Sequence, residues 1–215
     1  MYPAFEKLPG EKKVLILTIC IDEFSKNGYE NTSTDTITGR AGISKGILFH
    51  YFKSKKNLFL AVFEHCLKLL VEVTMEQIDK LATTDFFERI KAIILIKQSV
   101  AIQYFQETQL VLKTMSQPPV PVKSEIGTMV ADYERTFGDP LSLHAVFKGE
   151  LVSSLPLREG VSGESVFNLT IMMLTQISNK YMQLYTTNKD MPAHYESVAK
   201  EIDEYIEIIK YGVYR

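Results

Sequence analysis

The segment Thr32–Lys56, TSTDTITGRAGISKGILFHYFKSKK, constrains the fold of this 215-residue chain more than any other part. Thr32-Ser33-Thr34 comes before one short segment and Ser44 before a second, and Ala41-Gly42 lies between the two segments. Ser and Thr are favoured just before a helix begins, whereas Gly is favoured just after a helix ends. We therefore predict a helix that ends near Ala41, a tight turn, and a second helix from Lys45 to about Phe52.

The remainder of the chain also has helical spacing, and no segment shows a convincing strand alternation. Apolar residues recur at steps of three and four, which predicts amphipathic helices. Asn27-Gly28 ends the first helix, Ser54 can cap the long helix after the turn, and Pro118–Pro121 is a hard break. The predicted helices cover residues 11–26, 55–81, 86–101, 105–115, 122–137, 141–155, 164–185 and 193–211. The fold class is therefore all-α.

The long helix predicted over residues 55–81 is long enough to leave the N-terminal group of helices and enter the rest of the chain. We therefore place a domain boundary inside it. Residues 1–69 are expected to form a three-helix helix-turn-helix domain, with the motif at about residues 32–52. Residues 70–215 are expected to form a larger helical domain, and 46% hydrophobic residues is ample for a packed core.

Charge is distributed unevenly along the chain. Residues 1–60 contain nine Lys and Arg against six Asp and Glu, a net charge of +3, whereas the remainder contains fifteen against twenty, a net charge of −5. The window from Arg40 to Lys56 holds five cations and no acid. A local basic patch of this kind indicates a surface that meets phosphate groups. The plainer alternative is a solvated charged face.

The cysteines and histidines do not form a metal or disulfide motif. Cys20 and Cys66 lie far apart without a C-x-x-C spacing, and the four histidines lack an H-x-x-x-H pattern. We expect no metal, no cofactor and no enzymatic activity. The first residues lack an apolar signal-peptide core, and the longest apolar runs are too short to cross a bilayer. We therefore expect a cytoplasmic protein with no membrane association.

A helix-turn-helix that reads DNA needs a bracing helix, a tight turn and a second helix whose outer face enters the major groove. The inner packing can come from Ile37, Ala41, Ile43, Leu48 and Phe52. The residues that project on the other side are Lys45, Gly46, Phe49 and His50. We therefore predict that this segment binds double-stranded DNA.

The run GRAGISKGILFHYFKSKKNLF, preceded by GYENTSTDTI, resembles the DNA-binding domain of the tetracycline-repressor (TetR) family of transcriptional regulators. The similarity spans roughly Pro9–Leu69. It implies an all-α homodimer with an N-terminal operator-binding domain and a larger C-terminal domain that binds a small effector. Most members of that family are repressors that a ligand releases from DNA, so the resemblance implies a ligand-responsive repressor.

The resemblance also implies individual DNA contacts. Phosphates are assigned to Ser33, Thr34 and Lys55, base edges to Lys45, Gly46 and Ile47, and the groove and backbone to Phe49, His50 and Tyr51.

Some of these positions depart from the family pattern. Phe49 stands in place of a common Tyr and lacks its phosphate-contacting hydroxyl. Ile47 stands in place of a common Thr and favours apolar contact, such as that with a thymine methyl. Gly39 should weaken the bracing helix, and Lys56, in place of a common acid, should add affinity for the DNA backbone.

The C-terminal part is rich in aromatic and Met side chains, most of which we expect in the core. By resemblance, this part encloses an effector pocket, and flexible Met with aromatic rings would suit an apolar or flat ligand. The candidate pocket residues are Tyr104, Phe105, Met129, Tyr133, Phe137, Phe147, Phe167, Met172 and Gln176. Residues that could orient a ligand are Glu107, Gln109, Gln176 or Asn179, and their spacing does not distinguish between them.

The last two predicted helices carry more apolar surface than one core face needs. Two such helices from each of two chains can form a four-helix bundle, which predicts a homodimer. The candidate interface residues are Met173, Ile177, Tyr181, Tyr195, Val198, Ile202, Tyr205 and Ile209. A two-fold axis would present the Lys45 helices to half-sites about one helical turn, roughly 34 to 36 Å, apart, which implies a near-palindromic operator.

Two other functions fit some of the same residues. The sequence GISKG at residues 42–46 matches the G-x-S-x-G pattern of a serine hydrolase, but that motif needs a buried strand before the serine, and the residues there are polar and capped as a helix. The other alternative is an effector-independent, DNA-bound structural or partner-recruiting protein with a filled C-terminal core. A ligand-sized cavity would distinguish it from a ligand-responsive regulator.

Overall fold

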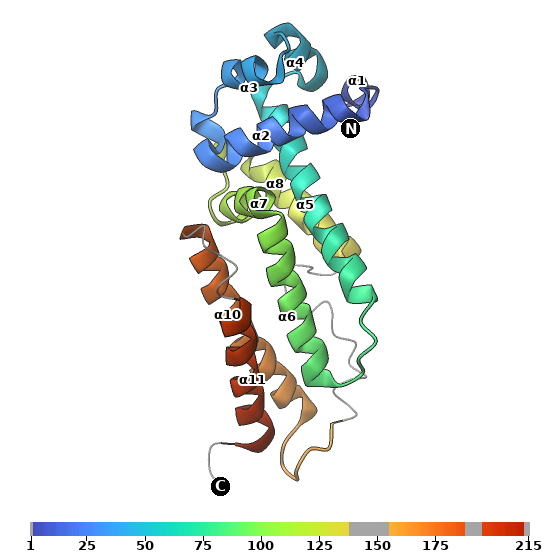
Figure 1. Ribbon diagram of the computed structural model, residues 1–215, viewed down its shortest axis with the longest axis vertical. Helices are drawn as coiled ribbons and strands as arrows, with labels where there is room; N and C mark the ends of the chain where they lie inside the picture. Colours follow the sequence, from blue (N-terminus) through green and yellow to red (C-terminus); the bar gives the residue numbers. More distant parts are fainter. Residues whose placement is uncertain (1, 138–154, 188–194, 213–215) are drawn as a thin grey trace. The chain divides into compact units, whose positions relative to one another are not determined.

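The computed structural model describes residues 2–137, 155–187 and 195–212 (Figure 1). Within these ranges the regular elements are all helical, which confirms the predicted all-α class. The elements are α1 (Pro3–Glu6), α2 (Gly10–Asn31), α3 (Thr34–Ala41), α4 (Lys45–Phe52), α5 (Lys55–Asp79), α6 (Phe86–Gln103), α7 (Phe105–Ser116), the single-turn helix η1 (Val120–Val122), α8 (Lys123–Phe137), α10 (Gly163–Thr187) and α11 (Tyr195–Tyr211). The helix predicted over residues 141–155 lies outside the described residues except at its last position.

The end of α2 differs from its prediction. Gly28 has φ 70° and ψ −179°, so the helix breaks where Asn27-Gly28 predicted a stop, yet helical hydrogen bonding resumes and continues to Asn31. Glycine tolerates this positive φ because it has no Cβ. The Thr32 hydroxyl oxygen then lies 2.6 Å from the carbonyl oxygen of Gly28 and 3.1 Å from that of Glu23, and caps the broken end.

Helix α1 was not predicted, because four residues are too few for a periodic pattern. Tertiary contacts hold it against α4 instead. The ring of Phe5 lies 4.9 Å from that of Phe52, and the ring of Tyr2 lies 5.2 Å from it. The Tyr2 hydroxyl also donates to the carbonyl oxygen of Asn57 at 3.0 Å.

The chain divides into two compact units. The first contains residues up to Val71 together with residues 104–132, and the second contains residues 72–103 and 133–215. The division within α5 falls two residues from the boundary predicted after residue 69, but α7, η1 and most of α8 return to the first unit. A functional boundary at residue 69 stays a prediction.

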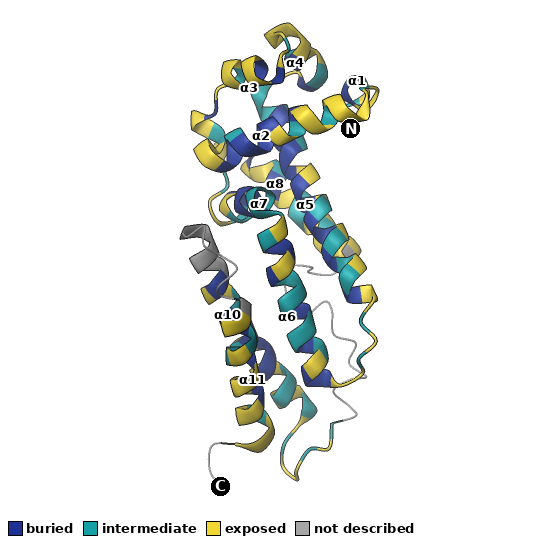
Figure 2. Ribbon diagram, viewed as in Figure 1, coloured by how far each residue is buried: buried dark blue, intermediate teal, exposed yellow. Residues whose placement is uncertain are grey.

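The first unit is centred on α2, which contacts both α3 and α7. Large apolar residues of these helices and of the first part of α5 are buried, and Figure 2 colours the buried positions dark blue. The fully or nearly fully buried ones include Ile16, Ile37, Leu48, Phe52, Phe59, Phe63 and Val111. Burying each such side chain stabilises the fold by roughly 1.5–3 kcal/mol. The short helices α3 and α4 therefore rest on a rigid base.

The second unit is a packing of α6, α10 and α11, each of which contacts the other two. Its fully buried residues include Ile90, Ile93, Ile94, Leu174, Val198 and Ile202. Polar contacts lie at the edges of this packing. Lys91 pairs with Asp203. Glu201 accepts hydrogen bonds from the ammonium of Lys180 at 2.9 Å and from the hydroxyl of Tyr181 at 2.8 Å. These contacts tie α6 and α10 to α11.

Candidate nucleic-acid interface

Three small residues fix both ends of α3 and the start of α4. Ser33 begins α3, and its hydroxyl oxygen accepts the backbone N–H of Asp35 at 3.2 Å. Gly42 ends α3 in the left-handed conformation, with φ 63° and ψ 33°. Ser44 begins α4, and its hydroxyl oxygen accepts the backbone N–H of Ile47 at 3.2 Å. The predicted caps and the predicted tight turn are confirmed.

The G-x-S-x-G pattern at residues 42–46 is a helix-capping sequence in this structure. A hydrolase nucleophile sits on a sharp turn between a strand and a helix. Ser44 instead follows helix α3 and a turn, and its hydroxyl oxygen accepts a backbone hydrogen bond in the first turn of α4. The hydrolase interpretation therefore has no structural support at this serine.

One side of the motif is buried as predicted. Ile37 and Leu48 are fully buried, Phe52 is 1% exposed and Ala41 is 7% exposed, whereas Ile43 is half-buried. Leu48 and Phe52 lie four positions apart and therefore share one side of α4. This side locks α4 against the rest of the first unit.

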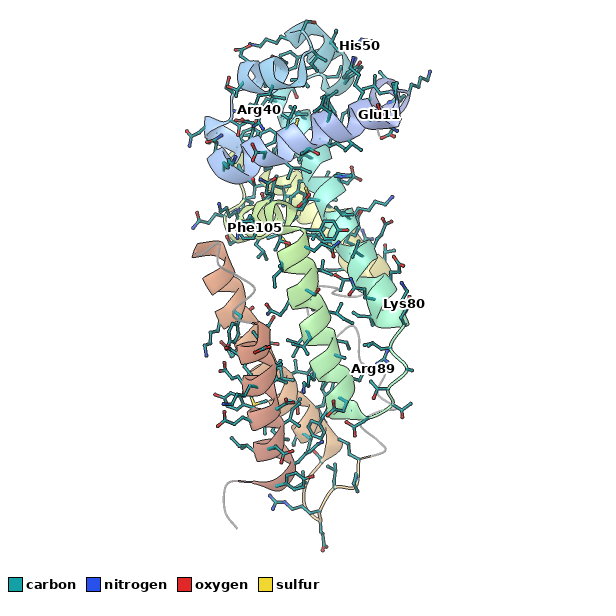
Figure 3. The ribbon with its side chains drawn as sticks, in the orientation of Figure 1. Glu11, Arg40, His50, Lys80, Arg89 and Phe105 are labelled. Atoms are coloured by element: carbon teal, nitrogen blue, oxygen red, sulfur yellow. The ribbon has the colours of Figure 1, made fainter. Side chains whose placement is uncertain are left out.

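The opposite side of α4 faces solvent. Lys45, Gly46, Ile47 and His50 are all exposed, and Figure 3 labels His50 on this helix. Ile47 is 40% exposed, which is unusual for a large apolar residue. A Cβ added at Gly46 would meet only the hydroxyl of Ser44, at 3.8 Å, so packing within the chain does not require glycine there.

The two aromatic residues assigned to the groove are less accessible. Phe49 and Tyr51 are half-buried. The ring of Tyr51 makes an edge contact with the ring of Phe5 in α1, with 5.9 Å between centroids. Tyr51 thus helps to hold α1 as well as bordering the exposed side of α4.

The five cations of the acid-free window do not form an acid-free surface, because three of them pair with acids outside the window. The guanidinium of Arg40 lies 2.6 Å from the carboxylate of Asp22 and 2.6 Å from that of Glu23. The other pairs are Lys45 with Asp35 at 3.0 Å and Lys56 with Glu125 at 2.6 Å. In the free protein Glu125 therefore pairs with Lys56, and the expectation that Lys56 adds affinity for the DNA backbone stays a prediction.

Lys55, the residue assigned to a phosphate at the start of α5, is held against the end of α2. Its ammonium donates to the carbonyl oxygen of Glu30 at 2.9 Å and lies 5.1 Å from the ring centroid of Tyr29. Neither contact neutralises its charge with a carboxylate. Ser33 is exposed and Thr34 half-buried at the start of α3, so both assigned hydroxyl residues lie at that helix end.

Residues 16–62, which run from α2 into α5, match the family described as bacterial regulatory proteins, tetR family. The N-terminal domain belongs to the TetR family. Over 101 residues, the chain is 34% identical to the HTH-type transcriptional regulator RutR of Escherichia coli, an alignment that covers 46% of this chain and 45% of RutR. The chain spans about half the length of the curated relatives it matches.

Two solved transcriptional regulators match this chain over nearly its whole length. One is a TetR family regulator from Chloroflexus aurantiacus, with a TM-score of 0.64 at 20% identity, covering 99% of this chain and 98% of that one. The other is FadR from Bacillus subtilis in complex with stearoyl-CoA, with a TM-score of 0.61 at 19% identity, covering 94% and 99%. At these identities the likeness shows a shared fold.

The residues predicted to line an effector pocket fall in both units. Tyr104, Phe105 and Met129 belong to the first unit. Those of the second unit include Tyr133, Phe167, Met172 and Gln176. Met172 is 62% exposed and Gln176 is also exposed, whereas Phe167 is half-buried. The side chain of Phe137 and the whole of Phe147 lie outside the described residues. This set stays a prediction.

Gln98 is a candidate ligand-binding residue that sequence reasoning missed. Its side chain is fully buried in α6, and neither its Nε2 nor its Oε1 has a hydrogen-bond partner among the described residues. Leaving a buried polar group unpaired costs roughly 1–3 kcal/mol. A glutamine at this position, which lies four residues after the buried Ile94, was the only available sequence signal.

Four residues predicted at the dimer interface are instead part of the core of a single chain. Ile177 and Tyr181 of α10 are 4% and 6% exposed, and Val198 and Ile202 of α11 are fully buried. They face the packing of α6, α10 and α11 and are not available to a partner. The helical stripe was correctly recognised, but among its predicted interface residues whose side chains are described only Tyr205 is exposed, at 37%. Met173 and Ile209 are half-buried, and the side chain of Tyr195 lies outside the described residues.

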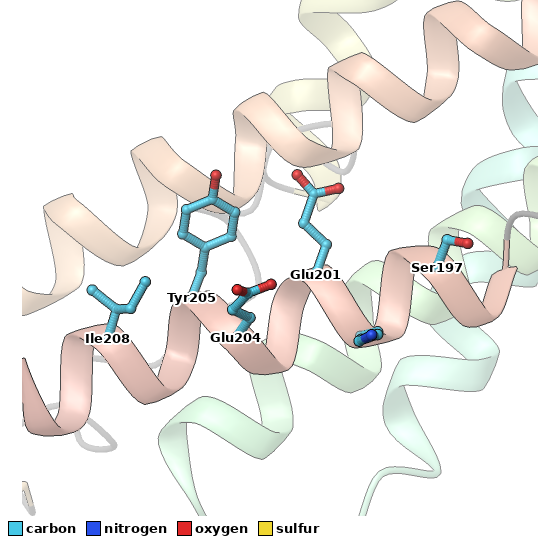
Figure 4. A pocket seen from close by; sticks show the side chains of 6 residues that line it. Ser197, Glu201, Glu204, Tyr205 and Ile208 are labelled. Atoms are coloured by element: carbon cyan, nitrogen blue, oxygen red, sulfur yellow. The ribbon is translucent and has the colours of Figure 1, made fainter. Parts of the chain in front are cut away.

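Accessible apolar residues do occur on both helices. Leu169 and Met172 of α10 are 48% and 62% exposed, and Tyr205 and Ile208 of α11 are 37% and 41% exposed. An open hollow of about 480 Å³ lies along α11. Figure 4 shows side chains that line it, among them Glu201, Glu204, Tyr205 and Ile208. A second hollow, of about 680 Å³, lies in the same unit near Phe87.

In the part of the chain that the structure describes, no helix is both long and apolar enough to cross a membrane. The same residues contain no group of three or more His, Cys, Asp or Glu that could hold a metal ion.

Proposed function

We propose that this protein is a transcriptional repressor that binds a near-palindromic DNA operator as a homodimer and is released by a small effector. The observation that carries the DNA-binding role is the outer side of α4, where Lys45, Ile47 and His50 are exposed on a helix whose inner side is buried. A major-groove reader needs such a rigid helix with side chains free on one side. Such a regulator acts at its operator, so we place the protein in the cytoplasm.

The exposed apolar residues of the last two helices support the homodimer. Leu169 and Met172 lie three positions apart on α10, and Tyr205 and Ile208 lie three positions apart on α11, so each pair shares one side of its helix. Two helices from each chain would then form a four-helix bundle. A two-fold axis would present two copies of α4 to inverted half-sites.

Gln98 supports the effector. A ligand that offers both a donor and an acceptor, such as a carboxamide or a protonated carboxylic acid on an apolar body, would satisfy this buried amide, which has no partner among the described residues. FadR of Bacillus subtilis, which shares the fold, was solved with stearoyl-CoA, a ligand with an apolar acyl chain. In the alternative without an effector, the Gln98 amide has no partner among the described residues and binds no ligand.

Helix α5 is the element through which an effector would act. It contributes its residues up to Val71 to the unit that holds α4, and its residues from Glu72 onward to the unit that holds Gln98. A ligand releases DNA only if it binds the DNA-incompetent arrangement more tightly, and each 1.4 kcal/mol of that difference is worth about tenfold. We infer that effector binding displaces α5 and respaces the two copies of α4.

Selection of bound duplexes from a random pool tests the proposal directly. The full chain should enrich a sequence with two inverted half-sites whose centres lie about 10 base pairs apart. Enrichment of a single half-site would contradict the dimer, and the absence of any enriched sequence would contradict operator binding.

A further inference from the structure

Asp35 and Lys45 form an ion pair on the DNA-facing side of the helix-turn-helix. The ammonium of Lys45 lies 3.0 Å from Oδ1 of Asp35 and 3.1 Å from Oδ2, so both carboxylate oxygens are within reach. The side chain of Asp35 is 72% exposed, and that of Lys45 is 51% exposed. The pair joins the first turn of α3 to the first residue of α4.

The backbone on both sides of this pair is well defined. The N–H of Asp35 donates to the hydroxyl oxygen of Ser33, and the carbonyl oxygen of Asp35 accepts from the hydroxyl of Thr38 at 3.0 Å. Lys45 directly follows Ser44, which caps α4. The two side chains therefore meet because α3 and α4 are fixed, not because a flexible loop brings them together.

The pair changes what Lys45 can contribute to DNA binding. A lysine that binds a phosphate releases a counterion from DNA, and this release drives binding that is independent of sequence. While Asp35 neutralises Lys45, the pair carries no net charge and contributes little to that term. Exposed ion pairs are weak, so a better partner can displace the carboxylate.

We propose that Asp35 is a specificity residue, which neutralises Lys45 on non-matching DNA and releases it only where a base edge offers acceptors such as O6 and N7 of guanine. Once Lys45 has moved, the Asp35 carboxylate is left near phosphates and is repelled by them. Only a matched base edge compensates for both the lost ion pair and the repulsion of Asp35 by the phosphates. This inference rests on the DNA-binding function proposed above.

The test compares the wild type with Asp35→Asn on the selected operator and on a random duplex of equal length, over a series of salt concentrations. Asparagine keeps the shape of the side chain and removes its charge. On random DNA, the variant should bind roughly twofold to fivefold more tightly, and its plot of log affinity against log salt should steepen by about 0.9. The ratio of operator to random affinity should fall by a similar factor.

Two controls separate this role from a general charge effect. Glu88→Gln removes one negative charge from an exposed position in the first turn of another helix, α6, and should leave the salt slope unchanged. In a Lys45→Ala background, Asp35→Asn should no longer steepen the salt slope, because the cation that it frees is absent. Thermal unfolding of each variant checks that the fold is retained.

Each outcome decides the inference. An unchanged salt slope and an unchanged affinity ratio in Asp35→Asn would overturn it while leaving the proposed function intact. If Asp35→Asn lost operator affinity and also lost the preference at one base pair, the inference would again be overturned, because Asp35 would then be reading a base itself. If the wild type prefers no sequence at all, the proposed function fails first.

Discussion

The guanidinium of Arg40 lies 2.6 Å from the carboxylate of Asp22 and ties the last turn of α3 to α2, as the position of Arg40 in Figure 3 illustrates. Asp22 is only 8% exposed, and its carboxylate also lies 2.6 Å from the ammonium of Lys26 and 2.9 Å from Nε2 of Gln106. Gln106 belongs to α7, so donors from three helices meet on one carboxylate. The position of α3 against α2 and α7 therefore depends on the charge of Asp22.

Asp22→Asn should destabilise the first unit. The substitution weakens the hydrogen bonds from Arg40 and Lys26, and hydrogen bonds to charged groups contribute roughly 1.5–3 kcal/mol each. Because Arg40 keeps its contact with Glu23, we expect a net loss of about 1–3 kcal/mol in the free energy of unfolding, measured by urea titration. Asp79→Asn, at the exposed last position of α5, is the matched control and should change stability by less than about 0.5 kcal/mol.

The same carboxylate predicts how stability depends on pH. The pKa of Asp22 lies below its usual value because Lys26 and Arg40 donate hydrogen bonds to the carboxylate, and these outweigh the opposing effect of burial. A lowered pKa in the folded state stabilises the protein above the unfolded value of about 3.9, and that stabilisation is lost as pH falls through the folded pKa. The advantage of the wild type over Asp22→Asn should therefore be full at about pH 6 and shrink below about pH 4. A difference that stays constant into acid would contradict this role.

Two glycines of the motif should respond to alanine in opposite directions. Gly39 lies inside α3, and a Cβ built there would have no neighbour within 4 Å, so Gly39→Ala should raise the free energy of unfolding by about 0.5–1 kcal/mol. Gly42 has φ 63°, and Gly42→Ala should lower it by about 1–2 kcal/mol. Thermal unfolding measures both changes. Destabilisation by Gly39→Ala would mean that its neighbours in α3 are more crowded than described.

Lys45 and Lys55 should affect DNA binding in different ways. Lys45→Ala should reduce discrimination at one base pair of the operator by about 1–3 kcal/mol, because Lys45 is assigned to a base edge. Lys55→Ala should weaken binding to all sequences alike and make the salt dependence shallower by about 0.9. Affinities for the operator and for random DNA over several salt concentrations measure both. Equal losses on the two DNAs in Lys45→Ala would refute its role in reading bases.

Met172→Lys should disrupt the proposed dimer without unfolding the chain. Met172 is 62% exposed, so a lysine is tolerated in a monomer, whereas a charge placed in an apolar interface is strongly unfavourable. Sedimentation of the variant should show a monomer that keeps its helical circular dichroism spectrum, and its thermal midpoint should fall because dimerisation no longer stabilises the fold. Ser124→Lys, at an exposed position of α8, introduces the same charge and should remain dimeric. A dimeric Met172→Lys would place the interface elsewhere.

Local patterns were enough to predict most helices and the turn. Ser33, Gly42 and Ser44 act through hydrogen bonds and backbone angles within a few residues, so their roles follow from the adjacent sequence. The hydrophobic period likewise located the buried side of α4. The caps and the turn depend on neighbours in the sequence, which explains why the predicted helix ends in this region agree with the structure.

Contacts between distant segments could not be read from the sequence. The pairing of Lys56 with Glu125 joins α5 to α8, and nothing near Lys56 in the chain indicates it. The burial of Val198 and Ile202 could not be separated from an interface role, because an apolar stripe looks the same whether α6 or a second chain covers it. Helix α1 likewise depends on tertiary contacts, among them those of the Tyr2 and Phe5 rings with Phe52.

Gln98→Met should stabilise the ligand-free protein. Methionine has nearly the same length and volume as glutamine but no polar group that needs a partner, and the Gln98 amide is fully buried with no partner among the described residues. The free energy of unfolding should rise by about 1–3 kcal/mol, the approximate penalty of an unpaired buried polar group. Urea titration of both proteins without added ligand measures the change.

The same substitution separates an effector site from a filled core. If the Gln98 amide holds a ligand, decanamide should raise the thermal midpoint of the wild type but not that of Gln98→Met, because the variant offers neither a donor nor an acceptor. Decane, which lacks the amide, is the matched ligand control and should not distinguish the two proteins. If Gln98→Met is less stable than the wild type, the amide is already satisfied within the fold, and the argument for an effector at this residue fails.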